Sequence, residues 1–356
     1  MIFAFGIYSY LKLFFFALYL IARFMEYKLN NLKMKQLVFF ITFSFITCMA
    51  NAQLPGEIKW KENLVKNRIQ VQTQWNHKYE KGKPKKDGYK NFSKKYDRKG
   101  NIIEEIYYSA GKKGSIDQKL SYKYDNKENR IEYINNKVSE GKILLKQNFT
   151  YDSKGKKISE ERFNGSDHEL IKYNYDSKDR LQEIIKTDTL DNILQVRSFE
   201  YNGNKSTVTI LNQDKRVLGK IINVYDKNNN IIETVEYDVN GKISEQFYFV
   251  FNGNLMTQKT KYDLESFSYM ENYSYDKKGN IIEVKREQPK GNFYINNTYK
   301  YDSDGNLIEE RWYDDDPTEY SQKTYSYSSK GLLERVEVYY VSYKYRMQYR
   351  YEYQSY

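Results

Sequence analysis

Cysteine and histidine are nearly absent from this chain of 356 residues. It has one cysteine, Cys48, and two histidines, His77 and His168. Zinc sites and histidine-based nucleophilic catalysis draw their groups from these residue types, so two isolated histidines favour neither. Glycine-rich phosphate-binding patterns are also missing. The sequence therefore predicts no catalytic residue, no cofactor and no metal site.

Long apolar runs occur only near the start of the chain. Residues 34–52 have a basic beginning, an apolar run from Leu37 to Ile46 and small residues before a cleavage point after Ala52. This pattern predicts a secretory signal peptide. The apolar residues 1–33 are then either the product of a start codon assigned too far upstream or a membrane segment. Cleavage would remove Cys48, unless this cysteine carries a lipid as in a lipoprotein.

Charge of one sign does not dominate. The chain has 58 Lys and Arg against 47 Asp and Glu, a net charge of +11, with acids and bases interleaved. The densest basic stretch runs from Lys78 to Lys95. A solvated segment explains it better than a nucleic-acid site, because the predicted export removes the chain from nucleic acid. We therefore expect no nucleic-acid partner.

One repeated phrase is abundant: an aromatic residue, usually an acid, two loop residues, usually glycine, then asparagine and two aliphatic residues. Its clearest copies are YDRKGNII, YDKKGNII and YDSDGNLI. The ten copies start at Tyr96, Tyr124, Tyr151, Tyr175, Tyr201, Tyr225, Phe251, Tyr275, Tyr301 and Tyr327. By subtraction, successive starts lie 24 to 28 residues apart. Such a period predicts a stacked array of structural units.

Each phrase has the chemistry of a tight turn. Asp at the first turn position accepts hydrogen bonds from amides further on, and Gly at the fourth tolerates a positive φ. The phrase therefore predicts the tip of a β-hairpin with a glycine bulge. In the simplest register Tyr301 faces Asn306, and Tyr299 faces Ile308.

The strands that flank each phrase are predicted to have an aromatic face and a polar face. A second aromatic residue usually stands two positions before each start, as Tyr299 does before Tyr301. On the opposite face falls a recurring acid, at Glu104, Glu132, Glu183, Glu233, Glu283 and Glu309. A row of acids beside Lys, Ser and Thr is typical of a solvated sheet face.

A second, less regular turn lies between phrases, so each unit supplies two strands. We predict an all-β fold in which tandem β-hairpin repeats form one long antiparallel meander, a curved or curled open sheet or solenoid. Residues 53–95 would be an irregular N-terminal cap, and residues 96–356 the repeat array. The tyrosine-rich end, Tyr339 to Tyr356, would cap the other side. No helix is expected after the signal peptide.

Aromatic residues are the remaining signal, with 38 Tyr, 19 Phe and 3 Trp. A groove lined by Trp312, Tyr313 and Tyr320 would suit stacking against sugar rings, and these three are the ligand-binding candidates. The simpler interpretation is that tyrosine is the core residue of this repeat. An outer-membrane barrel is disfavoured, because charged residues are too dense in the strands for an apolar outer band.

The tandem YDxxGN phrase resembles the YD repeat of the rearrangement hot-spot (RHS) family, over roughly residues 96 to 353. Large members of that family build curled β-shells around a toxin segment, and others are cell-surface proteins that engage carbohydrates or neighbouring cells. The resemblance implies a short exported member. No self-cleaving core segment is recognisable here, so we do not expect an enclosed C-terminal toxin.

These observations predict an exported, non-catalytic scaffold of the periplasm, outer surface or exterior of a bacterial cell. Its expected partner is a carbohydrate or a cell-surface protein, with membrane contact only through the N-terminal segment if that is retained. Three alternatives stay open. One is a glycan-active enzyme with paired carboxylates from the glutamate face. Another is a module that adds strands at an open sheet edge, and the third is a remnant or accessory of an RHS-type toxin system.

Overall fold

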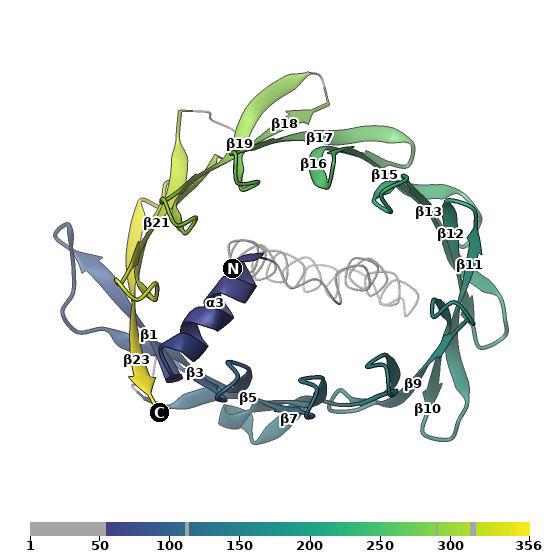
Figure 1. The fold of residues 1–356 in the computed structure, drawn as a ribbon, viewed down its shortest axis with the longest axis horizontal. Helices are drawn as coiled ribbons and strands as arrows, with labels where there is room; N and C mark the ends of the chain where they lie inside the picture. The colour runs from purple at the N-terminus through teal and green to yellow at the C-terminus, as the bar shows by residue number, and fades with distance from the viewer. Residues whose placement is uncertain (1–54, 111–113, 290, 314–317) are drawn as a thin grey trace.

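The computed structural model describes residues 55–110, 114–289, 291–313 and 318–356 (Figure 1). The predicted signal peptide at 34–52 and the segment at 1–33 lie outside these residues, so both interpretations stay predictions. Among the described residues, no helix has the length and apolar character needed to span a membrane.

The described residues form one α-helix, one short 3-10 helix and 23 strands. These are α3 (Pro55–Lys66), β1 (Ile69–Glu80), β2 (Lys83–Pro84), β3 (Tyr89–Tyr96), β4 (Ile102–Tyr108), β5 (Ile116–Tyr124), β6 (Arg130–Lys137), η1 (Val138–Glu140), β7 (Lys142–Tyr151), β8 (Lys157–Phe163), β9 (His168–Tyr175), β10 (Leu181–Asp188), β11 (Ile193–Asn202), β12 (Lys205–Asn212), β13 (Val217–Tyr225), β14 (Ile231–Tyr237), β15 (Ile243–Asn252), β16 (Leu255–Asp263), β17 (Ser266–Tyr275), β18 (Ile281–Gln288), β19 (Asn292–Tyr301), β20 (Leu307–Tyr313), β21 (Tyr320–Tyr327), β22 (Leu333–Tyr340) and β23 (Tyr345–Ser355).

The strands close into a ring, which corrects the predicted open sheet or solenoid. From β3 to β23 each strand pairs antiparallel with the next, and β1 pairs with both β3 and β23. The two-residue β2 pairs only with β1, so 23 − 1 = 22 strands make a closed antiparallel barrel (Figure 1). Closure gives each end strand a second partner. In an open sheet the end strands would keep unpaired backbone groups.

The two predicted caps are the elements that meet at this closure. The described residues 55–95 supply α3, β1, β2 and most of β3, and the expectation of no helix was wrong. β1 pairs with β23 from Ile69 opposite Ser355 to Lys78 opposite Met347. α3 lies inside the ring, beside this junction (Figure 1).

The repeated phrases are hairpin tips, as predicted. In the β17–β18 turn, Asp276 Oδ1 accepts hydrogen bonds from the amides of Lys278 and Asn280, at 2.8 and 2.9 Å. Gly279 has a φ of 80°, the left-handed conformation that favours glycine. The turns curl toward the axis of the ring at one rim (Figure 1).

The predicted cross-strand register was wrong, because a bulge shifts the pairing. Tyr301 pairs with Leu307, and Tyr299 pairs with Glu310, because the register shifts between Lys300 and Tyr301. The same shift just before the motif tyrosine recurs at most hairpins, for example between Ser274 and Tyr275. A bulge adds one residue to one strand, and a strict period of two does not reveal it.

The aromatic face turns inward and packs against α3. The ring of Trp60 lies 6.3 Å from that of Tyr353, centroid to centroid, and Leu64 and Tyr96 are 1% and 2% exposed. We call the side of the strands that faces α3 the inner wall, and the opposite side the outer wall. The apolar core is concentrated where α3 meets β3 and β20 to β23.

Candidate functional site

The inner wall carries the densest arrangement of functional groups. The motif tyrosines form the first set of these groups. The hydroxyl of Tyr301 donates to the carbonyl of Ile281 at 2.8 Å, and that of Tyr327 donates to Leu307 at 3.0 Å. The same contact with the preceding hairpin is made by Tyr124, Tyr151, Tyr175, Tyr201, Tyr275 and Tyr353. Seven of the ten phrases therefore use their first tyrosine to join their own hairpin to the one before it.

Buried glutamates form a second set of groups on the inner wall. Tyr122 donates to Glu105 at 2.8 Å, and Tyr273 donates to Glu271 at 2.8 Å. Glu160 and Glu310 accept in the same way from Tyr173 and Tyr325. Each of the four carboxylates also has a basic neighbour within 3.4 Å, which is Lys94, Arg162, Arg286 or Lys323. We call these four residues the inner glutamates.

The basic neighbours decide the charge of these buried acids. Burial would raise the pKa of Glu105, but the charge of Lys94 and the hydroxyl of Tyr122 outweigh it and hold the pKa below its usual range. The pKa of Glu160 is lowered against burial in the same way, chiefly by Arg162. Burial and the charge of Glu271 raise the pKa of Tyr273. Glu105 and Glu160 are thus held in the ionised form, and the raised pKa values of Tyr173 and Tyr273 keep these donors neutral.

One inner-wall acid, Glu236, faces a second acid and has no ion pair of its own among the described residues. Glu236 of β14 pairs directly with Glu245 of β15. Burial, with the charge of Glu245, raises the pKa of Glu236 to about 7, against the opposing effect of Lys261. Lys261 is 3.0 Å from Glu245. Glu236 therefore exchanges its proton near neutral pH, and it is the only inner-wall carboxyl among the described residues with a raised pKa.

α3 is held by polar contacts on both sides of the ring closure. Lys61 Nζ lies 2.7 Å from Asn101 Oδ1 and from Glu128 Oε2, which belong to turns of the first hairpins. Lys59 Nζ lies 2.7 Å from the carbonyl of Asp304 and from Asn306 Oδ1, in a turn near the other end of the chain. The helix therefore bridges the first and last repeats across the β1–β23 junction.

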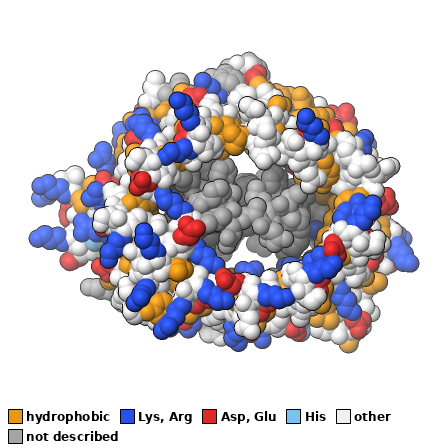
Figure 2. Space-filling model, in the orientation of Figure 1, with side chains coloured by type: hydrophobic (Ala, Val, Ile, Leu, Met, Phe, Trp, Pro, Cys, Tyr) orange, Lys and Arg blue, Asp and Glu red, His pale blue; other side chains and the backbone are white. Residues whose placement is uncertain are grey.

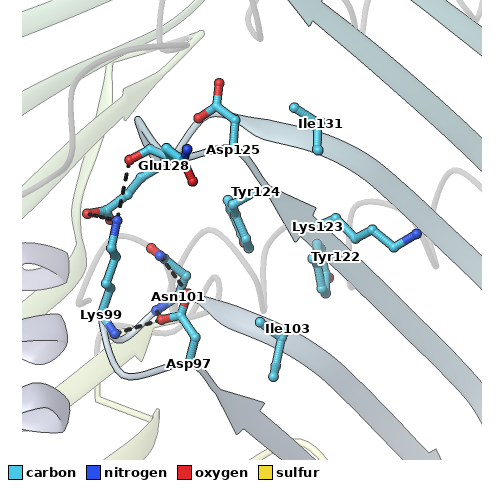
Figure 3. Close-up of a pocket in the computed structure, with 11 residues that line it drawn as sticks. Asp97, Lys99, Asn101, Ile103, Tyr122, Lys123, Tyr124, Asp125, Glu128 and Ile131 are labelled. Carbon is cyan, nitrogen blue, oxygen red and sulfur yellow. Dashed lines mark hydrogen bonds and ion pairs between the residues drawn. The ribbon is translucent and has the colours of Figure 1, made fainter.

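A small pocket lies between two of the inward-curled turns (Figure 3). Asp97 and Asn101 come from the β3–β4 turn, Glu128 comes from the β5–β6 turn, and Lys99 reaches between the turns. Lys99 Nζ is 3.8 Å from Glu128 Oε1. The remaining lining residues are Ile103, Tyr122, Lys123, Tyr124, Asp125, Asn126 and Ile131. The charged side chains of this pocket make contacts that stabilise the turns. The pocket is therefore a structural feature of the rim.

The predicted ligand-binding residues do not form one groove. Trp312 is on the inner wall, where its ring lies 5.8 Å from that of Tyr340. Tyr313 and Tyr320 pair with each other on the outer wall, with ring centroids 5.6 Å apart. Alternation along β20 places Trp312 and Tyr313 on opposite faces.

The recurring glutamates lie on the outer wall beside basic or polar partners. Glu132 pairs with Lys123 at 2.8 Å, and Glu309 pairs with Lys300 at 2.9 Å. Glu104, Glu183, Glu233 and Glu283 occupy equivalent outward positions, all half-buried. Among the described residues, no group of three or more His, Cys, Asp or Glu side chains could hold a metal ion.

Sequence reasoning missed the inner glutamates, although a signal for three of them exists. Glu105, Glu160 and Glu310 each stand nine residues after a motif start, at Tyr96, Tyr151 and Tyr301. An acid on a face of aromatic and aliphatic residues needs a partner. That position could have identified these three residues as buried acids.

No family model and no curated protein matches this chain. Among solved structures it is similar to a porin-like protein from Bacteroides uniformis, with 8% identity and a TM-score of 0.30, over 81% of this chain and 97% of that one. A porin-like protein from Bacteroides vulgatus has 14% identity and a TM-score of 0.23, over 80% and 98%. The Photorhabdus luminescens Tc holotoxin pore has 13% identity and a TM-score of 0.21, over 75% of this chain and only 19% of that chain. TM-scores this low carry no argument, so the resemblance to YD repeats stays a prediction.

Proposed function

We propose that this protein is an exported, non-catalytic scaffold of the cell envelope or exterior, which binds a carbohydrate through the inner wall of a closed ring of YD-type hairpins. The observation that carries the proposal is the inner wall itself, where aromatic rings alternate with ionised and amide side chains. Sugars present apolar faces that stack on aromatic rings, and hydroxyls that bond to carboxylates and amides.

The sector of the inner wall from β15 to β18 has this chemistry away from α3. The rings of Phe247 and Phe249 are stacked with centroids 6.3 Å apart. The Arg286 guanidinium lies 4.2 Å from the ring centroid of Tyr269, and its terminal nitrogen lies 2.8 Å from Glu271. This sector offers both stacking surfaces and charged hydrogen-bonding groups.

The polar character of the outer wall favours a ring that is surrounded by water. Its strands carry ion pairs between neighbouring strands, such as Lys123 with Glu132 and Lys119 with Glu104. A lipid-facing barrel needs an apolar outward band, and each charge at the bilayer midplane would cost about 2–4 kcal/mol. Basic and acidic side chains are also interspersed around the visible rim (Figure 2).

A glycan array probed with the protein, purified after expression of the full chain, tests the proposal. We expect binding above background to at least one glycan class, and loss of that binding in Tyr269→Ala. The matched control is Tyr262→Ala, which removes a half-buried tyrosine from the outer wall of the neighbouring strand. No binding to any glycan, or equal loss in both variants, would contradict the carbohydrate proposal.

The enzyme alternative has one specific observation in its favour, the Glu236–Glu245 pair. A carboxyl whose pKa is about 7, paired across the strands with a second carboxyl, shares the raised pKa of a glycosidase general acid. Incubating the protein with a glycan that it binds, and analysing the products by mass spectrometry, separates the two functions. Cleavage that Glu236→Gln abolishes would replace the scaffold proposal, whereas an intact glycan supports it.

A further inference from the structure

A strongly basic hairpin projects from the ring at the closure. Residues 78–90, which we call the basic arm, contain six lysines against one glutamate and one aspartate, so their net charge is 6 − 2 = +4. The arm comprises the end of β1, the short strand β2 and the start of β3, and it stands clear of the ring wall (Figure 1). Lys78, Lys81, Lys83, Lys85 and Lys86 are exposed.

The basic arm has a defined structure, although the sequence alone suggested a solvated segment. Glu80 pairs with Lys83 across a turn in which Lys81 and Gly82 have positive φ values. The amide of Lys85 donates to the carbonyl of Lys78 at 2.8 Å. The buried ring of His77 lies 2.9 Å from the carbonyl of Lys85, and it packs so closely on Gly88 that a Cβ there would be 2.6 Å away. The lysines are therefore held on a preformed hairpin.

Within the arm, almost none of this charge is neutralised. Lys85 makes an ion pair of 3.1 Å with Glu80, and it is the only ion pair within the described arm. The β22–β23 turn lies alongside, because Lys78 pairs with Met347. That turn adds Lys344 and an exposed aromatic residue, Tyr343, at 82% exposure, and the exposed Arg346 follows at the start of β23. The surface is thus basic, convex and edged by tyrosine.

We propose that the basic arm and the β22–β23 turn form a docking surface for the anionic phosphate headgroups of a lipid membrane. Each lysine near an anionic bilayer surface contributes attraction, and an exposed tyrosine suits the interface between headgroups and water. The convex shape favours a membrane, because a plane can meet a projecting hairpin, whereas a linear polyanion is usually held in a groove. The proposal is independent of the function of the inner wall.

Co-sedimentation with vesicles tests this docking surface. The protein, purified after expression of the full chain, is mixed with phosphatidylcholine vesicles, and with the same vesicles containing about 30 mol% phosphatidylglycerol. We expect binding only to the anionic vesicles, and release at about 0.5 M salt, because screening shortens the range of the attraction. Equal binding to both vesicle types would overturn the proposal.

A quadruple variant and a matched control locate the surface. Replacing Lys81, Lys83, Lys85 and Lys86 with Gln should weaken binding at least tenfold, because the attraction of about four lysines to the anionic membrane is lost. The control replaces Lys123, Lys172, Lys220 and Lys300 with Gln, which removes the same charge from the exposed outer wall. The control should bind as the unchanged protein does.

Two further outcomes would overturn the proposal. One is an equal loss of binding in both quadruple variants, which would indicate a general charge effect. The other is tight, arm-dependent binding to soluble polyphosphate with no binding to anionic vesicles. That result would assign the arm to a soluble polyanion. Circular dichroism spectra of the variants establish that each remains folded.

Discussion

At the scale of single residues, the tyrosine of each phrase has a task that phenylalanine cannot perform. Its ring lies on the inner wall, and its hydroxyl donates to a backbone carbonyl of the preceding hairpin, as from Tyr327 to Leu307. Tyr96 donates to the side chain of Gln72 and Tyr225 bonds that of Ser206 instead, and one copy of the phrase begins with Phe251. The repeat period therefore reflects a contact between neighbouring hairpins.

Tyr327→Phe should lower the free energy of unfolding by about 1–2 kcal/mol, since a half-buried carbonyl loses its hydrogen-bond partner. Tyr343→Phe is the matched control, because that side chain is 82% exposed, and it should change the free energy of unfolding by less than about 0.5 kcal/mol. Urea titration monitored by tyrosine and tryptophan fluorescence measures both. Similar values for the two variants would show that the hydroxyl contact contributes nothing.

Glu236 makes stability depend on pH in a defined direction. Its pKa is about 7 in the folded protein, against 4.5 for a free glutamate. Between these values the folded state keeps a proton that the unfolded state releases, so stability is lost as the pH rises from about 4.5 to 7. Glu236→Gln removes the buried charge, and it should stabilise the protein by up to about 3 kcal/mol at pH 8, with little effect at pH 4.

Urea titrations of this variant at several pH values check the prediction. Glu233→Gln is the control, because Glu233 lies on the outer wall of the same strand. A Glu236→Gln effect of equal size at pH 4 and pH 8 would mean that the folded protein does not raise the pKa of Glu236.

At the scale of elements, the hairpin tips follow from the phrase alone, whereas α3 does not. Asp276 and Gly279 specify their turn by chemistry that acts within five residues. The helix over Pro55–Lys66 is short, and its face toward the ring is defined by residues far away in the chain, such as Tyr353 and Leu332. Local sequence patterns carry no information about such partners.

α3 should be essential to the stability of the closure. Leu64 is 1% exposed and packs with Tyr96 and Leu332, so Leu64→Ala should cost about 2–5 kcal/mol of unfolding free energy. Its neighbour Val65 is 43% exposed, and Val65→Ala should cost less than about 1 kcal/mol. Thermal unfolding of the two variants tests this expectation. A Leu64→Ala protein as stable as the Val65→Ala protein would show that α3 is dispensable.

At the scale of the whole molecule, the sequence specifies hairpins and faces but not closure. The alternation predicted the outward glutamates, such as Glu309 opposite Lys300, and the inward tyrosines. The phrase predicts a bulge at each tip but does not specify how the curvature of many hairpins adds up, so the open sheet expected from the repeats was wrong. Ile69–Glu80 lacks the phrase, and its pairing with β23 was therefore invisible. Trp312 faces the inner wall and Tyr313 and Tyr320 face the outer wall, because adjacent residues of a strand face opposite sides.

The closed ring is tested most directly by a pulsed EPR distance across the β1 junction. Spin labels are placed at Lys95→Cys in β3 and Glu352→Cys in β23, both exposed, with Cys48 changed to Ser. Because β1 alone separates these strands, and strands lie about 4.8 Å apart, we expect one narrow distance below about 25 Å. Labels at Lys95 and at Glu200, which lies on β11 across the ring (Figure 1), should be farther apart. A broad distance beyond about 40 Å between positions 95 and 352 would indicate an open sheet and contradict the closed ring.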